Sequence, residues 1–349
     1  MPTTDVVNEN TLLFFSARVG RRETDGAEKR DCAMTPSDDE RDFCDTLNEA
    51  GCPFVYSTTD EVQMLREFMK ETFPERYVAE RLYHFTKPDV VMKLLTRDSD
   101  LRCTFYDRTN DSDEWQHGVD CVSDCLRERG EDDLADKVEA LPGKTGCSPW
   151  ICCFSQHDDS AAMWGMYGGR KDGGYAVGFA RAELEDLVDE KNQQGEDGYY
   201  LLPCLYERTD IEKVLEHILC ERHCDEDERT CREGCKDELE SRILSRIFFL
   251  TLILKDPSFA YEKEWRLVVR KCGVAYPLRN ETEIQWSGSP FILSGIFRKP
   301  LREYIKRIVV SPCGDAYEKE ENYNRVMSQK DRLNLNYEIE RSRSSYNGK

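Results

Sequence analysis

The sequence lacks the features that mark membrane-spanning, secreted and common nucleotide-binding proteins. No run of about 18 apolar residues occurs among its 349 residues, so we expect no transmembrane helix and no membrane partner. The first residues, MPTTDVVNENTLLFF, lack the basic and continuously apolar regions of a secretory signal, and we therefore expect a cytoplasmic protein. Neither a Gly-x-Gly-x-x-Gly motif nor a Walker loop is present, which argues against Rossmann and P-loop mechanisms.

Basic residues are also in short supply. The chain has 49 Lys and Arg against 69 Asp and Glu, which gives a formal net charge of −20. A field of this sign repels phosphate backbones, so the sequence disfavours a protein that coats nucleic acid. The acidic excess is interpreted as a means of keeping the protein soluble.

Cysteine, in contrast, is abundant, with 16 residues in the chain. In the reducing interior of a cell, these residues are expected to be thiols or metal ligands and not a disulfide framework. Cys152 or Cys153 could pair with His157 to form a nucleophilic thiol. The apolar strand that contains both cysteines, PWICCFS, favours buried and inert thiols instead.

The pattern of apolar residues predicts one α+β domain over residues 51–330. Residues 1–50 are polar, rich in both charges and without periodicity, which predicts a poorly ordered tail, and residues 331–349 are assigned to a C-terminal tail. Extended and helical runs alternate, as expected for a mixed or antiparallel sheet with flanking helices. The predicted strands lie at 80–86, 100–107, 149–155, 175–180, 199–207, 265–270 and 305–312. The predicted helices lie at 57–73, 86–95, 110–128, 158–167 and 315–329, with a longer helical region at 207–254.

Residues 207–254 form a predicted helical insert that is rich in cysteine. Cys220, Cys224, Cys231 and Cys235 could supply four soft ligands to zinc. On one unbroken helix they would span about 22 Å, so a single site requires the helix to turn back. Local thiol pairs or disulfides across a helical hairpin are the competing interpretations, and no metal is favoured. Because the insert is acidic, we expect it to be a structural or partner-binding element that is peripheral to catalysis.

Only five histidines occur, and one of them, His84, lies in the strand-like stretch RLYHFTK. The simplest interpretation is a core histidine with a satisfied hydrogen bond. Trp164 and Tyr167 are three residues apart on a short predicted helix, which is typical of core packing and is also compatible with a ring-stacking surface.

Glu264 precedes the predicted strand WRLVVR. A carboxylate at this position is usually a solvated strand end, or it can pair with Arg266, because residues two apart in a strand point the same way. It can also be a catalytic acid that the sheet holds rigidly. Glu262 lies two residues earlier and is the rival for any such role.

Several of these stretches together resemble a known family. LYHFT, NDSDEW, CCFSQHDDSAAMWGMY, GGYAVGF, KDPSFAYEKEWRLV and IKRIVVSP occur in the order typical of the bacterial family called domain of unknown function 2971. The resemblance covers roughly residues 80–330, and that family has been linked to abortive phage-infection proteins. The family in turn resembles the ADP-ribosyltransferase superfamily of the His-Tyr-Glu kind. The resemblance implies an ADP-ribosyltransferase-like split sheet.

The resemblance also implies site residues. It assigns NAD binding to five side chains in three segments, and it assigns catalysis to Glu264. The NAD-binding residues that it implies are His84, Thr86, Ser155, Trp164 and Tyr167. Cys153 stands where an aromatic residue is common in the superfamily, which is a departure from the usual pattern.

Two functions follow as expectations. The first is an NAD-consuming enzyme that transfers ADP-ribose to a macromolecular acceptor or hydrolyses NAD, in a defence or toxin setting. NAD is then a substrate, and no metal cofactor is implied. The second is a catalytically inactive domain of the same fold that binds a nucleotide or a protein.

Overall fold

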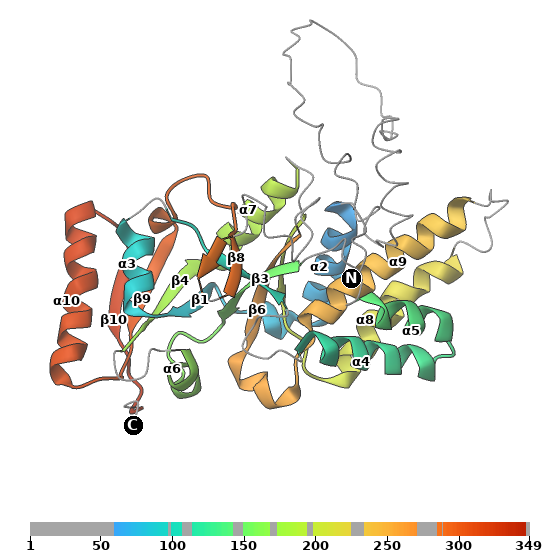
Figure 1. The fold of residues 1–349 in the computed structure, drawn as a ribbon, viewed down its shortest axis with the longest axis horizontal. Coiled ribbons are helices and arrows are strands. Elements are labelled where there is room, and N and C mark those ends of the chain that lie inside the picture. The colour runs from blue at the N-terminus through green and yellow to red at the C-terminus, as the bar shows by residue number, and fades with distance from the viewer. Residues whose placement is uncertain are drawn as a thin grey trace, which may run out of the picture. The chain divides into compact units, whose positions relative to one another are not determined.

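The extended segments of the chain assemble into one mixed sheet (Figure 1). The computed structural model describes residues 59–96, 99–106, 114–141, 149–167, 173–193, 198–224, 234–270, 285–287 and 289–346. The predicted tail at 1–50 therefore lies outside the described residues. The described residues belong to one compact unit, which spans Asp42–Lys349.

The sheet contains ten strands within the described residues. They are β1 (Arg81–Thr86), β2 (Arg102–Phe105), β3 (Pro149–Ser155), β4 (Tyr175–Ala180), β5 (Gly198–Pro203), β6 (Glu264–Arg270), β7 (Gln285–Ser287), β8 (Ser289–Leu293), β9 (Ile305–Val310) and β10 (Glu338–Arg341). The order is β10-β9-β4-β1-β3-β2-β8-β7, and β6 pairs with both β3 and β5. β9 and β10 are parallel, and the other strand pairs are antiparallel.

The register around β3 opens the sheet. β6 pairs with β3 along its whole length, from Pro149 to Ser155. A strand has only two edges, so β1 and β2 must share the other edge of β3. β2 pairs with Trp150 and Ile151, whereas β1 pairs only with Ser155. Residues 152–154 therefore have no strand partner on that edge, and a gap opens between β1 and β2.

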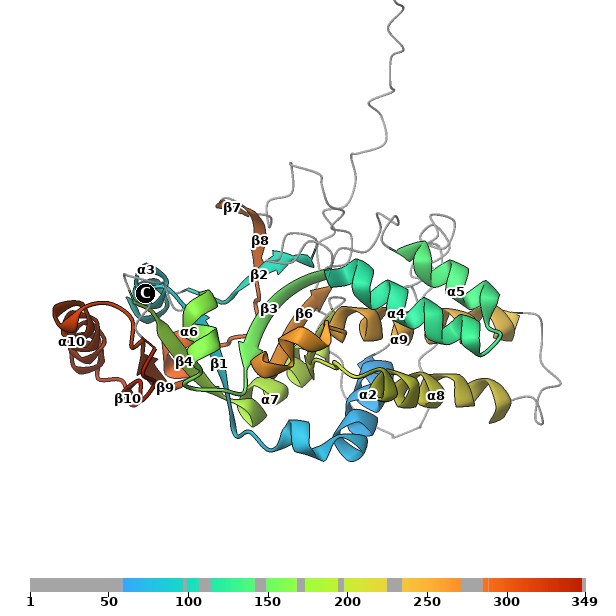
Figure 2. The same ribbon diagram turned by 90° about the horizontal axis from the view of Figure 1, so that it is seen from below.

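Helices flank the sheet (Figures 1 and 2). The α-helices are α2 (Thr59–Thr72), α3 (Pro88–Thr96), α4 (Glu114–Glu128), α5 (Asp132–Glu139), α6 (Ala161–Tyr167), α7 (Arg181–Asn192), α8 (Arg208–Cys224), α9 (Gly234–Ile253) and α10 (Ala316–Leu333). Short 3-10 helices are η1 (Pro74–Tyr77), η5 (Pro257–Glu262) and η6 (Leu301–Glu303). α4, α5, α8 and α9 pack together next to β6, while α3 and α10 lie near β4 and β9.

The helical insert is part of the core. The predicted apolar face of α8 is buried, and so are most of the apolar residues of α9. At Gly118, a Cβ atom would stand 2.2 Å from the carbonyl oxygen of Thr251, so only glycine lets α4 approach α9 this closely. This contact brings the beginning of α4 next to the end of α9. The insert was expected to be peripheral to catalysis, and this stays a prediction. Lys255, two residues after the end of α9, lines the cavity described below.

Two further segments differ from the sequence analysis. Residues 331–349 were expected to be a tail, but residues 338–341 form β10 at the edge of the sheet, in parallel register with β9. α10 precedes it and begins with a capping box, in which Asp315 and Glu318 accept each other's backbone N–H at 2.7 and 2.8 Å. β7 and β8 were not predicted at all.

Candidate functional site

The main cavity of the described residues lies at the gap between β1 and β2. Its volume is about 540 Å³, within the range of ligand pockets. Most of its wall is apolar or aromatic, and its polar groups come from segments far apart in the sequence. These include His84, Arg102, Cys153, Tyr167, Lys255, Glu262 and Glu264.

A cluster of buried charges occupies one part of this wall. Lys255 follows the end of α9, and its Nζ lies 2.6 Å from Oε2 of Glu262 and 3.4 Å from Oε1 of Glu114. The same Nζ also contacts Oε2 of Glu264. All four side chains are buried. Lys255 therefore holds together the end of η5, the beginning of β6 and the beginning of α4.

Arg266 forms the second cationic centre of the cluster and is fully buried. Its Nε donates to Oε1 of Glu264 at 2.9 Å, and it also contacts Glu114. Its Nη1 donates to the Tyr106 hydroxyl at 2.8 Å and to the Leu252 carbonyl at 2.6 Å. The pairing of Glu264 with Arg266 that the strand period allows is present in the structure.

The turn between η5 and β6 places two carboxylates on the same lysine. Lys263 has a φ of 42°, in the left-handed region that non-glycine residues rarely adopt. Glu262 and Glu264 stand on either side of it. The Ser155 hydroxyl donates to the Glu262 carbonyl at 2.6 Å and fixes this turn to the end of β3. Ser155 is buried and does not line the cavity, so it supports the turn instead of facing a ligand.

The two carboxylates titrate in opposite directions. Burial alone would raise the pKa of Glu264, but Arg266 and Lys255 outweigh it and lower the pKa to about 2. For Glu262, burial prevails over the attraction of Lys255, and its pKa is raised. Burial opposes the charge on Lys255, yet Glu264 and Glu114 raise its pKa. Glu264 is therefore ionised at neutral pH, and Glu262 is the carboxylate that takes up a proton first.

His84 on β1 contacts β3 across the gap in the sheet. Its Nδ1 lies 3.0 Å from the carbonyl oxygen of Cys153, which belongs to the edge of β3 without a strand partner. A carbonyl only accepts, so Nδ1 carries the proton, and Nε2 of the neutral ring is an acceptor. Burial lowers the pKa of His84, which favours this neutral form. The structure thus combines a satisfied histidine with a position in the cavity wall.

Tyr167 reaches the cavity from the end of α6. Its hydroxyl donates to Oε1 of Glu262 at 3.2 Å. The neighbouring Trp164 has no exposed surface, packs in an apolar cluster and donates from Nε1 to Asp159 at 2.7 Å. Trp164 is therefore a core residue that orients α6, and of these two rings only that of Tyr167 lines the cavity.

Of the residues that the sequence predicted, His84, Tyr167 and Glu264 line one cavity. Thr86 is buried at the end of β1 and is not part of the wall, as is also true of Ser155 and Trp164. Glu114, Arg102 and Lys255 were not predicted. Lys255 had a signal in the sequence, because a lysine directly after the apolar run LTLIL needs a buried partner or an end in solvent.

The cysteines of β3 are thiols. Cys152 is buried, and burial raises its pKa. Cys153 is open to the cavity, but its pKa is also raised, by desolvation and by Glu264, to which its thiol donates. Sγ of Cys152 lies 3.9 Å from the His84 ring and is not paired with His157. This supports inert thiols and argues against a thiolate nucleophile.

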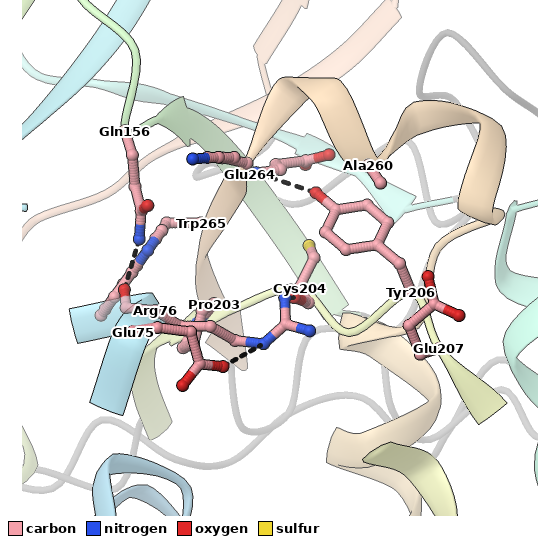
Figure 3. A pocket seen from close by; sticks show the side chains of 11 residues that line it. Glu75, Arg76, Gln156, Pro203, Cys204, Tyr206, Glu207, Ala260, Glu264 and Trp265 are labelled. Atoms are coloured by element: carbon pink, nitrogen blue, oxygen red, sulfur yellow. Dashed lines mark hydrogen bonds and ion pairs between the residues drawn. The ribbon is translucent and has the colours of Figure 1, made fainter. Parts of the chain in front are cut away.

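A second cavity of about 300 Å³ lies beside the first residue of β6 (Figure 3). The Tyr206 hydroxyl accepts from the Glu264 backbone N–H at 2.9 Å, as the dashed line shows. Arg76 in this wall is already bound to the Cys204 carbonyl at 2.9 Å and to Asp210 at 2.7 Å. This cavity holds no cluster of titratable groups comparable to that around Lys255.

The described residues give no indication of a metal site or a membrane span. Within them, no group of three or more His, Cys, Asp or Glu side chains is arranged to hold a metal ion. None of the described helices is both long and apolar enough to cross a membrane. Cys220 is exposed, and its thiol donates to the His217 carbonyl at 3.0 Å. Cys224, Cys231 and Cys235 lie outside the residues whose side chains are described, so the zinc and disulfide alternatives stay open.

Residues 163–267 match the family model "Protein of unknown function (DUF2971)". This match supports the expected relationship over a segment that contains Tyr167, Lys255 and both carboxylates of the turn. Neither a curated protein nor a solved structure matches the chain.

Proposed function

We propose that this protein consumes NAD, by transferring ADP-ribose to a macromolecular acceptor or by hydrolysing NAD. The observation that carries the proposal is the meeting of His84, Tyr167 and Glu264 at one cavity of about 540 Å³. Each residue comes from a different strand or helix, and the cavity is the gap that β1 and β2 leave along β3. The resemblance to ADP-ribosyltransferases of the His-Tyr-Glu kind, and through it a defence or toxin role in the cytoplasm, belongs to the same proposal.

The charge of the cluster suits this chemistry. Three carboxylates, Glu114, Glu262 and Glu264, surround two cations, Lys255 and Arg266, so the fully ionised cluster carries one net negative charge. The nicotinamide ring of NAD is positively charged, and breaking its bond to ribose moves that charge onto the ribose as an oxocarbenium-like state. A fixed carboxylate near the anomeric carbon of that ribose stabilises the growing positive charge.

Each proposed residue has a distinct task. Glu264 is ionised because its pKa is about 2, so it can accept a hydrogen bond from a ribose hydroxyl without first losing a proton. Nε2 of neutral His84 accepts a hydrogen bond from a hydroxyl of the adenosine ribose, since Nδ1 donates to the carbonyl oxygen of Cys153. The ring of Tyr167 covers the nicotinamide and excludes water, while its hydroxyl stays on Glu262.

One observation favours the alternative of an inactive binding domain. Both oxygens of Glu264 already contact a cation, Arg266 or Lys255, and a ribose hydroxyl must share them. Such a domain would bind NAD or ADP-ribose without cleaving it. The two functions are separated by measuring binding and turnover on the same protein.

The test is loss of NAD with release of nicotinamide, followed by chromatography, in the wild type and in Glu264→Gln. We expect the substitution to lower kcat at least about 100-fold, because the charge that the transition state needs is lost. It also leaves two buried cations short of one partner, so we expect about 3–5 kcal/mol of destabilisation. Thermal unfolding is therefore recorded alongside activity.

Two further variants sharpen the result. Asp210→Asn removes a partly buried ion pair with Arg76 away from the main cavity, and it controls for loss of stability alone. Glu262→Gln tests the rival carboxylate. If Glu264→Gln keeps full turnover and Glu262→Gln loses it, the catalytic role moves to Glu262. Binding of NAD by a wild type that releases no nicotinamide would establish the inactive alternative, and neither binding nor release would refute the proposal.

A further inference from the structure

Two basic side chains line the main cavity, Lys255 and Arg102, and they differ in their surroundings. Lys255 is buried and contacts three carboxylates. Arg102, on β2, has an exposed side chain, and within the described residues no carboxylate lies within 4.0 Å of it. Among the described residues, none therefore occupies its guanidinium donors, whereas the ammonium of Lys255 contacts three carboxylates.

Arg102 is held in place by an aromatic ring and not by a charge. β2 and β8 pair Arg102 with Leu293 and Thr104 with Phe291, so Phe291 is the diagonal neighbour of Arg102. The guanidinium carbon lies 4.2 Å from the centroid of the Phe291 ring, and that ring is buried. A stacked guanidinium keeps its in-plane N–H donors available, and this geometry suits a bidentate anion.

The strand order sets the distance between Arg102 and the carboxylate cluster. Arg102 and Thr104 lie two apart on β2 and share a face, and both line the cavity. β3 separates β2 from β6, which begins with Glu264. Two strand spacings correspond to about 10 Å, and the register places Glu264 two residues, or about 7 Å, further along the strands, so the two backbones lie roughly 12 Å apart. The cavity thus has carboxylates at one side and Arg102 at another, and the lining between them is largely apolar.

We propose that Arg102 binds the pyrophosphate of the dinucleotide. This inference rests on the proposed function, because it names the part of the ligand that meets β2. In NAD, one ribose lies between the nicotinamide bond and the pyrophosphate. This span is shorter than the separation of β6 from β2, and the side chains of Glu264 and Arg102 cover the rest. The cationic end of NAD then meets Glu264, and its anionic centre meets Arg102. This arrangement also explains how an acidic protein can accept a ligand that carries two phosphates.

The experiment measures equilibrium binding of ADP-ribose by calorimetry, with adenosine as a ligand that lacks phosphate. Arg102→Gln is expected to weaken ADP-ribose binding about 10- to 100-fold, the range for loss of charge-assisted hydrogen bonds, and to change adenosine binding less than about twofold. Arg102→Lys keeps the charge and should retain part of the affinity. Arg325→Gln on α10 removes an exposed arginine that pairs with Glu321, and it is the matched control.

The outcomes separate this inference from the proposed function. If wild type binds ADP-ribose but does not turn over NAD, and Arg102→Gln loses the binding, the proposed function fails and the role of Arg102 stands. If NAD is consumed with an unchanged KM in Arg102→Gln, and ADP-ribose affinity is also unchanged, the role of Arg102 is refuted and the proposed function stands. Equal losses for adenosine and ADP-ribose would also refute it, because they would indicate a general change in the cavity.

Discussion

Substitution of Lys255 by methionine tests the charge cluster most directly. Lys255 stands between Glu114, Glu262 and Glu264, and its removal changes the ionised cluster from one net negative charge to two. Removing one partner of a buried ion pair costs about 3–5 kcal/mol, because the remaining charges stay buried without compensation. We expect a loss of this size in the free energy of unfolding at pH 8.

The loss should depend on pH in a defined direction. Burial already raises the pKa of Glu262, and Lys255 opposes that rise. Without Lys255, the pKa of Glu262 rises further, and a group whose folded pKa is raised contributes stability at low pH that disappears as pH increases through that pKa. The destabilisation by Lys255→Met should therefore be smaller at pH 5 than at pH 8. Urea unfolding followed by circular dichroism at both pH values measures it.

A second substitution makes the prediction specific. Lys255→Met combined with Glu262→Gln restores one net negative charge and should recover about 1–3 kcal/mol at pH 8. Lys93→Met removes an exposed lysine 3.6 Å from Asp89 and should change stability by less than about 0.5 kcal/mol. Equal destabilisation at both pH values, together with no recovery in the double variant, would show that loss of packing and not charge explains the effect.

Two further predictions concern acid stability and the end of the chain. The pKa of Glu264 is lowered on folding from 4.5 to about 2, so the stability that Glu264 contributes is present above its ordinary pKa and is lost as the pH falls towards 2. This loss amounts to about 3 kcal/mol. Acid unfolding curves measure it, and it should be absent in Glu264→Gln. At Gly165 on α6, a Cβ atom would stand 3.2 Å from the Tyr346 hydroxyl. Gly165→Leu should therefore displace Tyr346 and speed amide hydrogen exchange in residues 342–346. Gly165→Ala should have little effect. Unchanged exchange in Gly165→Leu would contradict the contact.

Local sequence patterns determined most of the secondary structure. β3 and β4 have the limits predicted for them, β1 and β9 differ by one and two residues, and α6 lies within its predicted segment. These segments carry runs of apolar or β-branched residues, or a helical apolar face, which report on the chain over a few residues. β7, β8 and β10 were missed because they are short. β7 and β10 lie at the two edges of the sheet, and β8 and β10 pair with strands that are distant in the sequence.

The sequence also selected His84, Tyr167 and Glu264, through a resemblance in motif order, and it left Glu264 and Glu262 as rivals. It could not separate Tyr167 from Trp164, because both lie on α6 and only the packing of that helix against β1 decides which ring is buried. The same limit applies to Thr86 and Ser155, whose side chains turn into the core.

Only the tertiary structure decided what surrounds the carboxylates. Lys255, Arg266 and Glu114 meet because β6, α4 and the end of α9 pack together, and their pKa shifts follow from that burial. The cavity itself has no local signature either. It arises because β1 and β2 share one edge of β3 and pair with opposite ends of it, a consequence of strand register over many residues that no short stretch of sequence encodes.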